Sequence, residues 1–359
     1  MLRLVLLLLI FQDCFMKKPL AAFAALALST CVCAQTAFQA PLVEQSLLLD
    51  IAAAKHLVMV GERGHILLSD DGQQFTQAVV PTTATLTATT IVGDNIWAVG
   101  HDATILHSAD AGKTWQVQLS KPKIERPFLD VHFFDSRHGI AVGAYGMFYR
   151  TEDGGEHWRS ELHAALLDPY DREYLEQLRE EDEDFYNQEL GSILPHLNRL
   201  SAANGRLYLA GEAGTLAVSD DEGKTWQRFE VDYAGSFFDI APLDNNTMMA
   251  VGLRGNIFVM RTPGEWEYVK TCSTSTLNSI MVLSDTKVAA LGNNGMIVTL
   301  QRPLPVSEPD PYANPAQCTA AEGIDVTQIK DKAAIVNAIT FNNQILAVSA
   351  NGIKQLNLK

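Results

Sequence analysis

Five polar side chains in this sequence have the chemistry that hydrolysis of an acidic sugar would need. Arg63, Arg126 and Arg254 could bind a substrate carboxylate, and Tyr145 with Glu212 could act as a nucleophile pair. Ordinary glycoside hydrolysis needs two carboxylates at a defined separation. The turns around these residues supply three acidic side chains, with no clustering visible in the sequence: Glu62, Asp102 and Glu212. Hydrolysis is therefore the alternative function, and the leading prediction is a protein without catalytic residues.

Metal, cofactor and nucleic-acid chemistry have no matching pattern. The nine histidines are scattered, and none has the spacing of a metal-binding motif. No glycine-rich loop precedes a helix, so the sequence predicts no nucleotide phosphate site. The formal net charge of −15 argues against a nucleic-acid partner, because phosphate binding needs a basic surface. We predict no metal site and no small-molecule cofactor.

The candidate residues lie in a repeated turn, in which Gly, two further residues and a small residue separate two apolar runs. Six copies occur, at residues 61–64, 100–103, 143–146, 211–214, 252–255 and 292–295. A weaker seventh copy is at residues 349–352. Successive copies begin 39, 43, 68, 41, 40 and 57 residues apart. Four of these intervals match one four-stranded propeller blade, and the two longer ones predict insertions.

A second motif, Ser/Thr-x-Asp-x-Gly-x-x-Trp, follows four of these turns. Residues 108–115 and 219–226 fit it fully, residues 151–158 have His157 in the Thr position, and residues 69–75 are one residue short. Asp in such a turn accepts hydrogen bonds from following amides, and Gly supplies a positive φ. Trp then buries a large apolar surface between blades. The motif resembles the Asp-box of sialidase-type and related propellers, where it is a folding element.

These repeats predict an all-β fold, a seven-bladed β-propeller with Asp-box turns, as the single domain of residues 35–359. The predicted blades cover residues 46–80, 84–121, 127–161, 196–231, 236–272, 276–302 and 335–359. The last blade offers only three strands. We expect Ala37–Val43 to supply its outer strand, because ring closure of this kind removes exposed sheet edges.

Two insertions interrupt the period. Residues 162–195 have apolar residues at helical spacing, and their stretch 171–189 carries nine acids against two arginines. This acidic helical insertion is either a solvated flap or a partner-binding element. Residues 303–331 are rich in proline and predict an extended loop. We expect both insertions to join a fourth strand to the next first strand, on the face that carries the repeated glycine turns.

That face is the predicted partner-binding surface, because function usually lies on loops held by a rigid scaffold. Its candidate residues come from six turns and from the connection at residues 121–126: Arg63, His101, Arg126, Tyr145, Glu212, Arg254 and Asn293.

The N-terminus predicts export. Residues 1–34 read as a leader and secretory signal peptide, with the true start at Met16 and cleavage before Gln35. A lipoprotein with Cys31 as lipid acceptor is the alternative. Removal of residues 1–34 takes away three basic residues and one acidic residue, which leaves a net charge of −17. Only Cys272 and Cys318 remain, and we predict that they form a disulfide in the periplasm.

The stretch from Arg126 to Trp158 resembles the photosystem II assembly and stability factor family. That resemblance implies a seven-bladed Asp-box propeller that binds a membrane-protein client, with Arg63, Arg126 and Arg254 as contact residues. The acidic insertion departs from the family's basic client-binding face. Relatives in non-photosynthetic bacteria often accompany exporters of the resistance–nodulation–division (RND) type. The resemblance thus implies a non-catalytic periplasmic binding or assembly factor that docks a membrane or envelope protein, such as an RND transporter. The alternative remains a sialidase-like glycoside hydrolase.

Overall fold

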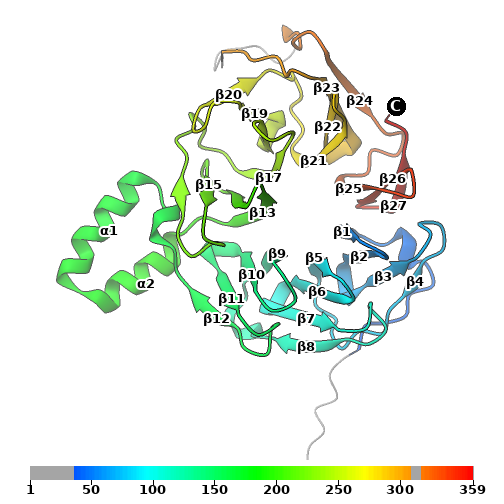
Figure 1. Ribbon diagram of the computed structural model, residues 1–359, viewed down its shortest axis with the longest axis horizontal. Coiled ribbons are helices and arrows are strands. Elements are labelled where there is room, and N and C mark those ends of the chain that lie inside the picture. Colours follow the sequence, from blue (N-terminus) through cyan, green and yellow to red (C-terminus); the bar gives the residue numbers. More distant parts are fainter. Residues whose placement is uncertain (1–35, 309–316, 359) are drawn as a thin grey trace, which may run out of the picture. The chain divides into compact units, whose positions relative to one another are not determined.

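The computed structural model describes residues 36–308 and 317–358, and Figure 1 shows them as a ring of β-sheets. The predicted signal peptide, Met16 and Cys31 lie outside the described residues. Twenty-seven described strands form seven antiparallel sheets, each with its strands in chain order. The prediction of a seven-bladed β-propeller is therefore confirmed.

Sheets one to four each have four strands. Sheet one contains β1 (Leu48–Ala53), β2 (Leu57–Gly61), β3 (Ile66–Ser69) and β4 (Thr76–Gln77). Sheet two contains β5 (Leu86–Val92), β6 (Asn95–Gly100), β7 (Thr104–Ser108) and β8 (Gln116–Leu119). Sheet three contains β9 (Phe128–Phe133), β10 (Gly139–Gly143), β11 (Phe148–Thr151) and β12 (Arg159–Glu161). Sheet four contains β13 (Leu197–Ala203), β14 (Arg206–Gly211), β15 (Leu216–Ser219) and β16 (Gln227–Arg228).

Sheets five to seven complete the ring. Sheet five contains β17 (Phe237–Pro242), β18 (Met248–Gly252), β19 (Ile257–Met260) and β20 (Trp266–Val269). Sheet six contains β21 (Leu277–Ser284), β22 (Lys287–Gly292), β23 (Met296–Gln301) and β24 (Ile324–Gln328). Sheet seven has three described strands, β25 (Ile335–Phe341), β26 (Gln344–Ser349) and β27 (Gly352–Leu356).

The repeated glycine turns join the second and third strands of each sheet. Their first glycine packs against the inner strand, and a Cβ on Gly143 would lie 2.2 Å from the carbonyl oxygen of Pro127. The last glycine of the same turn, Gly146, has a φ of +65°, which favours glycine. Strands in an antiparallel sheet alternate in direction, so these turns and the fourth-to-first connections share one face of the ring. We call it the glycine-turn face; the turns between third and fourth strands lie on the opposite, Asp-box face.

Hydrogen bonds close the Asp-box turns. In sheet two, the Gly112 N–H donates to Ser108 Oγ over 2.8 Å, and the Thr114 N–H donates to Asp110 Oδ1 over 2.8 Å. The bonds from Thr114 lower the pKa of Asp110 to about 2. In sheet three, His157 Nδ1 lies 2.7 Å from Asp153 Oδ2 and takes the place of the threonine hydroxyl.

Side chains of the inner strands bridge every interface between sheets. Three aspartates accept a backbone N–H from the next sheet: Asp50 from Thr89, Asp130 from Leu200 and Asp239 from Ile280. Three polar side chains donate to a carbonyl of the next sheet: Thr87 to Phe128, Asn198 to Phe237 and Asn278 to Ile335. Asn337 in sheet seven donates to Asp50 in sheet one. These bonds join the seven sheets into a closed ring.

The prediction that Ala37–Val43 forms the outer strand of the last sheet is wrong. The Ala37 N–H donates to the Val80 carbonyl over 2.8 Å, and the Ala40 N–H donates to Gln77 Oε1 over 2.9 Å, so this segment lies against sheet one. Pro41 interrupts it, and proline cannot donate to a strand ladder. Sheet seven has no fourth strand among the described residues.

The second insertion also differs from its predicted position. Strand β24 lies within residues 303–331, so the inserted segment joins the third and fourth strands of sheet six and starts from the Asp-box face. It then runs along β20, where the Ser307 N–H donates to the Tyr268 carbonyl over 2.8 Å. The five residues of β24 are exposed or half-exposed and follow a proline-rich stretch. The sequence therefore lacks the apolar pattern that would have predicted this strand.

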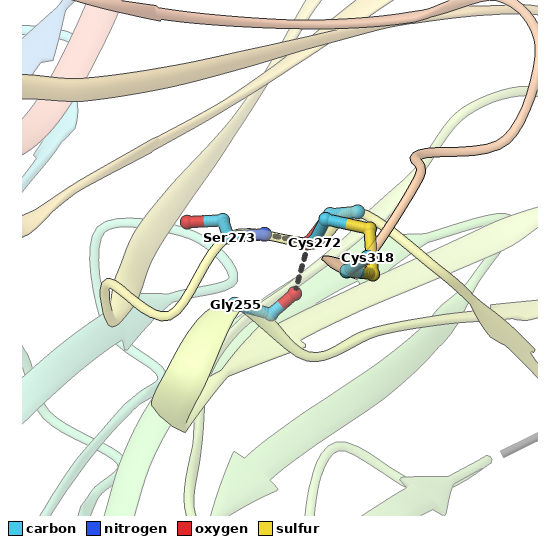
Figure 2. Close-up of a disulfide and its surroundings, with 5 residues drawn as sticks. Gly255, Cys272, Ser273 and Cys318 are labelled. Carbon is cyan, nitrogen blue, oxygen red and sulfur yellow. Dashed lines mark hydrogen bonds between the residues drawn. A yellow bond between two sulfur atoms is a disulfide. The ribbon is translucent and has the colours of Figure 1, made fainter. Parts of the chain in front are cut away.

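Cys272 and Cys318 form a disulfide with Cα atoms 5.6 Å apart. Figure 2 shows it beside Gly255, whose carbonyl accepts a hydrogen bond from Thr271 Oγ1 over 2.9 Å. Gly255 belongs to a glycine turn, so the disulfide fixes Cys318 of the inserted segment at the glycine-turn face.

The first insertion forms a helical hairpin, α1 (Pro169–Glu181) and α2 (Glu183–Ile193), at the left of Figure 1. Asp168 and Asp182 cap the two helices by accepting backbone N–H groups. Leu194, at the end of α2, is buried in one core cluster with Trp226 of sheet four. Within residues 36–308 and 317–358, neither helix is long and apolar enough to cross a membrane.

Candidate functional site

Three of the predicted partner-binding residues meet at the root of the helical hairpin. The guanidinium carbon of Arg126 lies 4.9 Å from the centre of the Tyr145 ring. Tyr145 packs edge-to-face on His196, with ring centres 4.6 Å apart. His196 donates its backbone N–H to Glu212 Oε2 over 3.3 Å. We call Arg126, Tyr145, His196 and Glu212 the Tyr145 cluster; it spans sheets two to four on the glycine-turn face.

Hydrogen bonds to backbone carbonyls join the cluster to the hairpin. Arg126 Nη1 donates to the Gly191 carbonyl of α2 over 3.1 Å. The Gly146 N–H, next to Tyr145, donates to the Pro195 carbonyl over 2.8 Å. A Cβ on Gly146 would lie 2.3 Å from Leu194 Cβ, so glycine is needed for this close approach. The hairpin and the Tyr145 cluster therefore form one surface, on which Tyr145 is 47% exposed.

The other four predicted residues lie on the same face but in different sheets. Arg63, His101 and Arg254 are exposed on the turns of sheets one, two and five. Asn293 of sheet six accepts a hydrogen bond from Asn278 over 3.0 Å and lines a cavity of about 300 Å³ on the ring axis. Among the described residues, no hydrogen bond or ion pair joins Arg63, Arg126 and Arg254, so they form no arginine cluster.

Sequence reasoning missed His196, which follows the insertion and has no motif of its own. It also missed an ionic centre on the axis. Arg199 of β13 lies 3.7, 3.6 and 3.8 Å from carboxylates of Asp50, Asp130 and Asp239, respectively. These four residues hold the same position in their inner strands, the third residue. A charged residue at a fixed position in a buried strand was the signal that could have revealed them.

We call Arg199, Asp50, Asp130 and Asp239 the axial centre. Its three carboxylates are buried, and burial changes the pKa values of the group. Burial raises the pKa of Asp130 to about 6, although Arg199 acts in the opposite direction. Burial likewise raises the pKa of Asp239. Burial would lower the pKa of Arg199, but the carboxylates of Asp130, Asp50 and Asp239 raise it above its ordinary value. The three carboxylates keep Arg199 charged.

The structure also bears on hydrolysis and on metal binding. The three acids named for hydrolysis belong to turns of sheets one, two and four. Among the described residues no hydrogen bond joins Tyr145 and Glu212, the proposed nucleophile pair; Tyr145 contacts the His196 ring, and Glu212 accepts the His196 backbone N–H. Ligand atoms of Asp153, Glu156 and His157 lie within 4.8 Å of one another. The Asp-box hydrogen bond between Asp153 and His157 accounts for the proximity of two of these three side chains.

Comparison with known proteins supports the sequence resemblance. The family described as photosynthesis system II assembly factor YCF48 matches residues 34–123. Photosystem II assembly lipoprotein Ycf48 of Synechococcus sp. (strain CC9902) is 29% identical over 180 residues, which cover 42% of this chain and 52% of that protein. The same protein of Parasynechococcus marenigrum (strain WH8102) is 27% identical over the same shares. The chain thus spans about half the length of these relatives.

Solved structures share the fold at low sequence identity. YCF48 bound to D1 peptide has a TM-score of 0.60 and 14% identity, covering 89% of this chain and 94% of that one. YCF48 from Cyanidioschyzon merolae has a TM-score of 0.60 and 16% identity, covering 87% and 96%. The WD40 propeller domain of Doa1 also reaches 0.60, with 11% identity over 90% and 95% of the two chains, so these scores describe the fold alone. The chain is thus a seven-bladed propeller, and part of its sequence is similar to photosystem II assembly factors.

Proposed function

We propose that this chain is a non-catalytic binding or assembly factor that docks a membrane or envelope protein on its glycine-turn face. The Tyr145 cluster carries the proposal, because it gathers an arginine, an exposed tyrosine and a carboxylate beside the helical hairpin. Tyrosine and arginine are the residue types that most often dominate the affinity of protein interfaces. The rigid ring holds these side chains on turns, where they need little ordering on binding.

The names of similar proteins support this class of function. Relatives are described as photosystem II assembly proteins, some as lipoproteins, and one solved relative is described as bound to D1 peptide. The matching region spans about half the length of the curated relatives. The identity of the partner of this chain therefore belongs to the proposal. The prediction of a signal peptide at residues 1–34 favours the periplasm.

More specifically, we propose that the chain acts as an accessory protein of an RND-type exporter, as the sequence resemblance implies. The acidic hairpin supports a partner different from that of the photosynthetic relatives. The junction of its two helices carries a run of five acids, Glu180–Asp184, at the end of the hairpin that points away from the ring. We infer that the partner surface combines a basic patch for the hairpin with an aromatic or acidic patch for Tyr145 and Arg126.

Site-specific crosslinking tests the proposal. A photo-crosslinking residue at position 145 in the full chain, expressed in its own host, should capture a membrane or envelope protein that mass spectrometry identifies. The same residue at Lys113, exposed in an Asp-box turn, is the matched control for the opposite face. Equal capture of one protein from both positions would contradict the assignment of the face.

Substitutions then test the named residues against the captured protein. Tyr145→Ala, and Glu in place of Arg63, Arg126 and Arg254 together, should weaken the affinity for the captured protein more than tenfold in a pull-down without crosslinker, a loss typical of interface hot spots. Lys113→Glu should leave capture unchanged, and thermal unfolding should show that each variant is folded. Turnover of fluorogenic sialosides or other glycosides by the purified chain would instead support the hydrolase alternative.

A further inference from the structure

We propose that the open edge of sheet seven, strand β27, binds an extended segment of another protein as its fourth strand. The other six sheets show what this position holds. Each has a fourth strand of two to five residues, paired antiparallel with the third. β27 is the third strand of its sheet and has no neighbour beyond it among the described residues. An edge of this kind offers backbone N–H and C=O groups to any extended chain.

The short helix Val43–Gln45 contacts β27 at its first residue, Gly352, but forms no strand pairing with it. The other described segments near this edge are bound elsewhere. Ala37, which the sequence placed here, pairs with Val80 of sheet one. β24 pairs with β23 in sheet six. After β27 the chain turns toward sheet six, where Lys287 Nζ donates to the Leu358 carbonyl over 3.4 Å. Within residues 36–308 and 317–358, no strand therefore pairs with the outer edge of β27.

The surface beside β27 sets the chemistry of the occupant. A shallow cavity of about 390 Å³ lies between residues 329–331 and residues 354–356. Ile329 and Leu356 supply apolar surface to it. Lys330 and Lys354 supply two positive charges, and Asp331 pairs with Lys354 over 2.5 Å. One positive charge therefore remains uncompensated, which favours an extended segment that alternates apolar and acidic side chains.

Charge also favours a different protein over a second copy of this chain. Two β27 edges paired with each other would bring the lysines of both copies together, and charged edge residues oppose such self-association. The edge lies on the rim of the ring, between sheets six and one, whereas the Tyr145 cluster lies at sheets two to four. The inference therefore goes beyond the proposed function, and each can fail without the other.

Hydrogen exchange of the full chain tests the inference. The probe is a synthetic peptide with the sequence of residues 322–330, which contains β24 and alternates Ile, Asp and Val. In the free chain, alternate amides of residues 353–357 should exchange at least about tenfold faster than those of β26. Millimolar peptide should slow their exchange and leave the Tyr145 cluster unaffected.

Two controls make the result decisive. A peptide with proline in place of Val326 cannot donate the central backbone hydrogen bond, so it should give no protection. Lys354→Glu should weaken binding of the acidic peptide several-fold while the thermal unfolding temperature shows that the ring is intact.

Protection of β27 in the free chain would overturn the proposal. If that protection grew with protein concentration, a second copy would be the occupant; otherwise it would be another part of this chain. Equal protection by the proline peptide, or protection only elsewhere, would also overturn it.

Discussion

Asn337 and Asp50 are 287 residues apart in sequence, and Asn337 Nδ2 donates a hydrogen bond of 2.7 Å to Asp50 Oδ1. The bond joins the last sheet to the first. The same carboxylate accepts the Thr89 N–H of sheet two over 2.9 Å, so Asp50 connects three sheets around the axis. Ring closure in the described residues thus depends on side chains of the inner strands and on core packing between β1 and β25, without a strand shared between the termini.

Asn337→Ala should lower the free energy of unfolding by about 1–3 kcal/mol, because it leaves an oxygen of a buried carboxylate without its donor. Urea unfolding followed by tryptophan fluorescence measures this change. Asn187→Ala, at an exposed position of α2, is the matched control and should change stability by less than about 0.5 kcal/mol. Similar stability of both variants would show that the bond contributes nothing to closure.

Arg199→Met should destabilise the ring by about 3–5 kcal/mol, because it leaves three buried carboxylates without their cation. Addition of Asp130→Asn should recover part of this loss by removing one of the uncompensated charges. Arg137→Met, at an exposed turn, serves as the control. An Arg199→Met chain as stable as the parent at neutral pH would contradict an ionised axial centre.

The axial carboxylates should make stability depend on pH. Burial raises the pKa of Asp130 to about 6 in the folded chain, above its ordinary value near 3.9. The folded state therefore holds a proton that the unfolded state releases. The contribution of Asp130 is most favourable below about pH 4, and it is lost as pH rises through about 6. Asp239, whose pKa burial also raises, acts in the same sense.

Comparison with Asp130→Asn isolates this effect. Buried or half-buried histidines whose pKa is lowered by burial act in the opposite sense, since they destabilise the fold as pH falls: His65, His107, His132 and His163. Relative to Asp130→Asn, the parent should therefore lose about 1–2 kcal/mol of stability between about pH 4.5 and pH 7.5. A constant difference between the two proteins across this range would exclude a raised pKa for Asp130.

Removal of the disulfide should loosen the second insertion. Cys272 and Cys318 close a chain segment with a sequence separation of 46, so their replacement by serine should cost about 2–4 kcal/mol. Limited proteolysis should then cut within residues 303–323 before any other part of the ring. Mass spectrometry of non-reduced protein exported to the periplasm checks the bond itself, and two free thiols there would contradict it.

The sequence determined the repeating unit. The glycine turns and the Asp-box residues, such as Asp110 with Thr114, act within a few residues of one another, so local spacing was enough to predict the blades and their number. The acidic hairpin was predictable for the same reason, because helical periodicity is a local property. Turn and connection positions alone predicted that the seven candidate residues share one face, and in the structure they lie on the glycine-turn face. Their role in binding stays a prediction.

Only the tertiary structure decided which of these residues meet. Tyr145 contacts His196 across an insertion of some 35 residues, and Asn337 contacts Asp50 across the whole ring. Such pairs depend on how sheets pack around an axis, which no local period encodes. The edge strand β24 and the open edge of β27 were missed because a short, half-exposed strand is defined by its partner strand more than by its own residues.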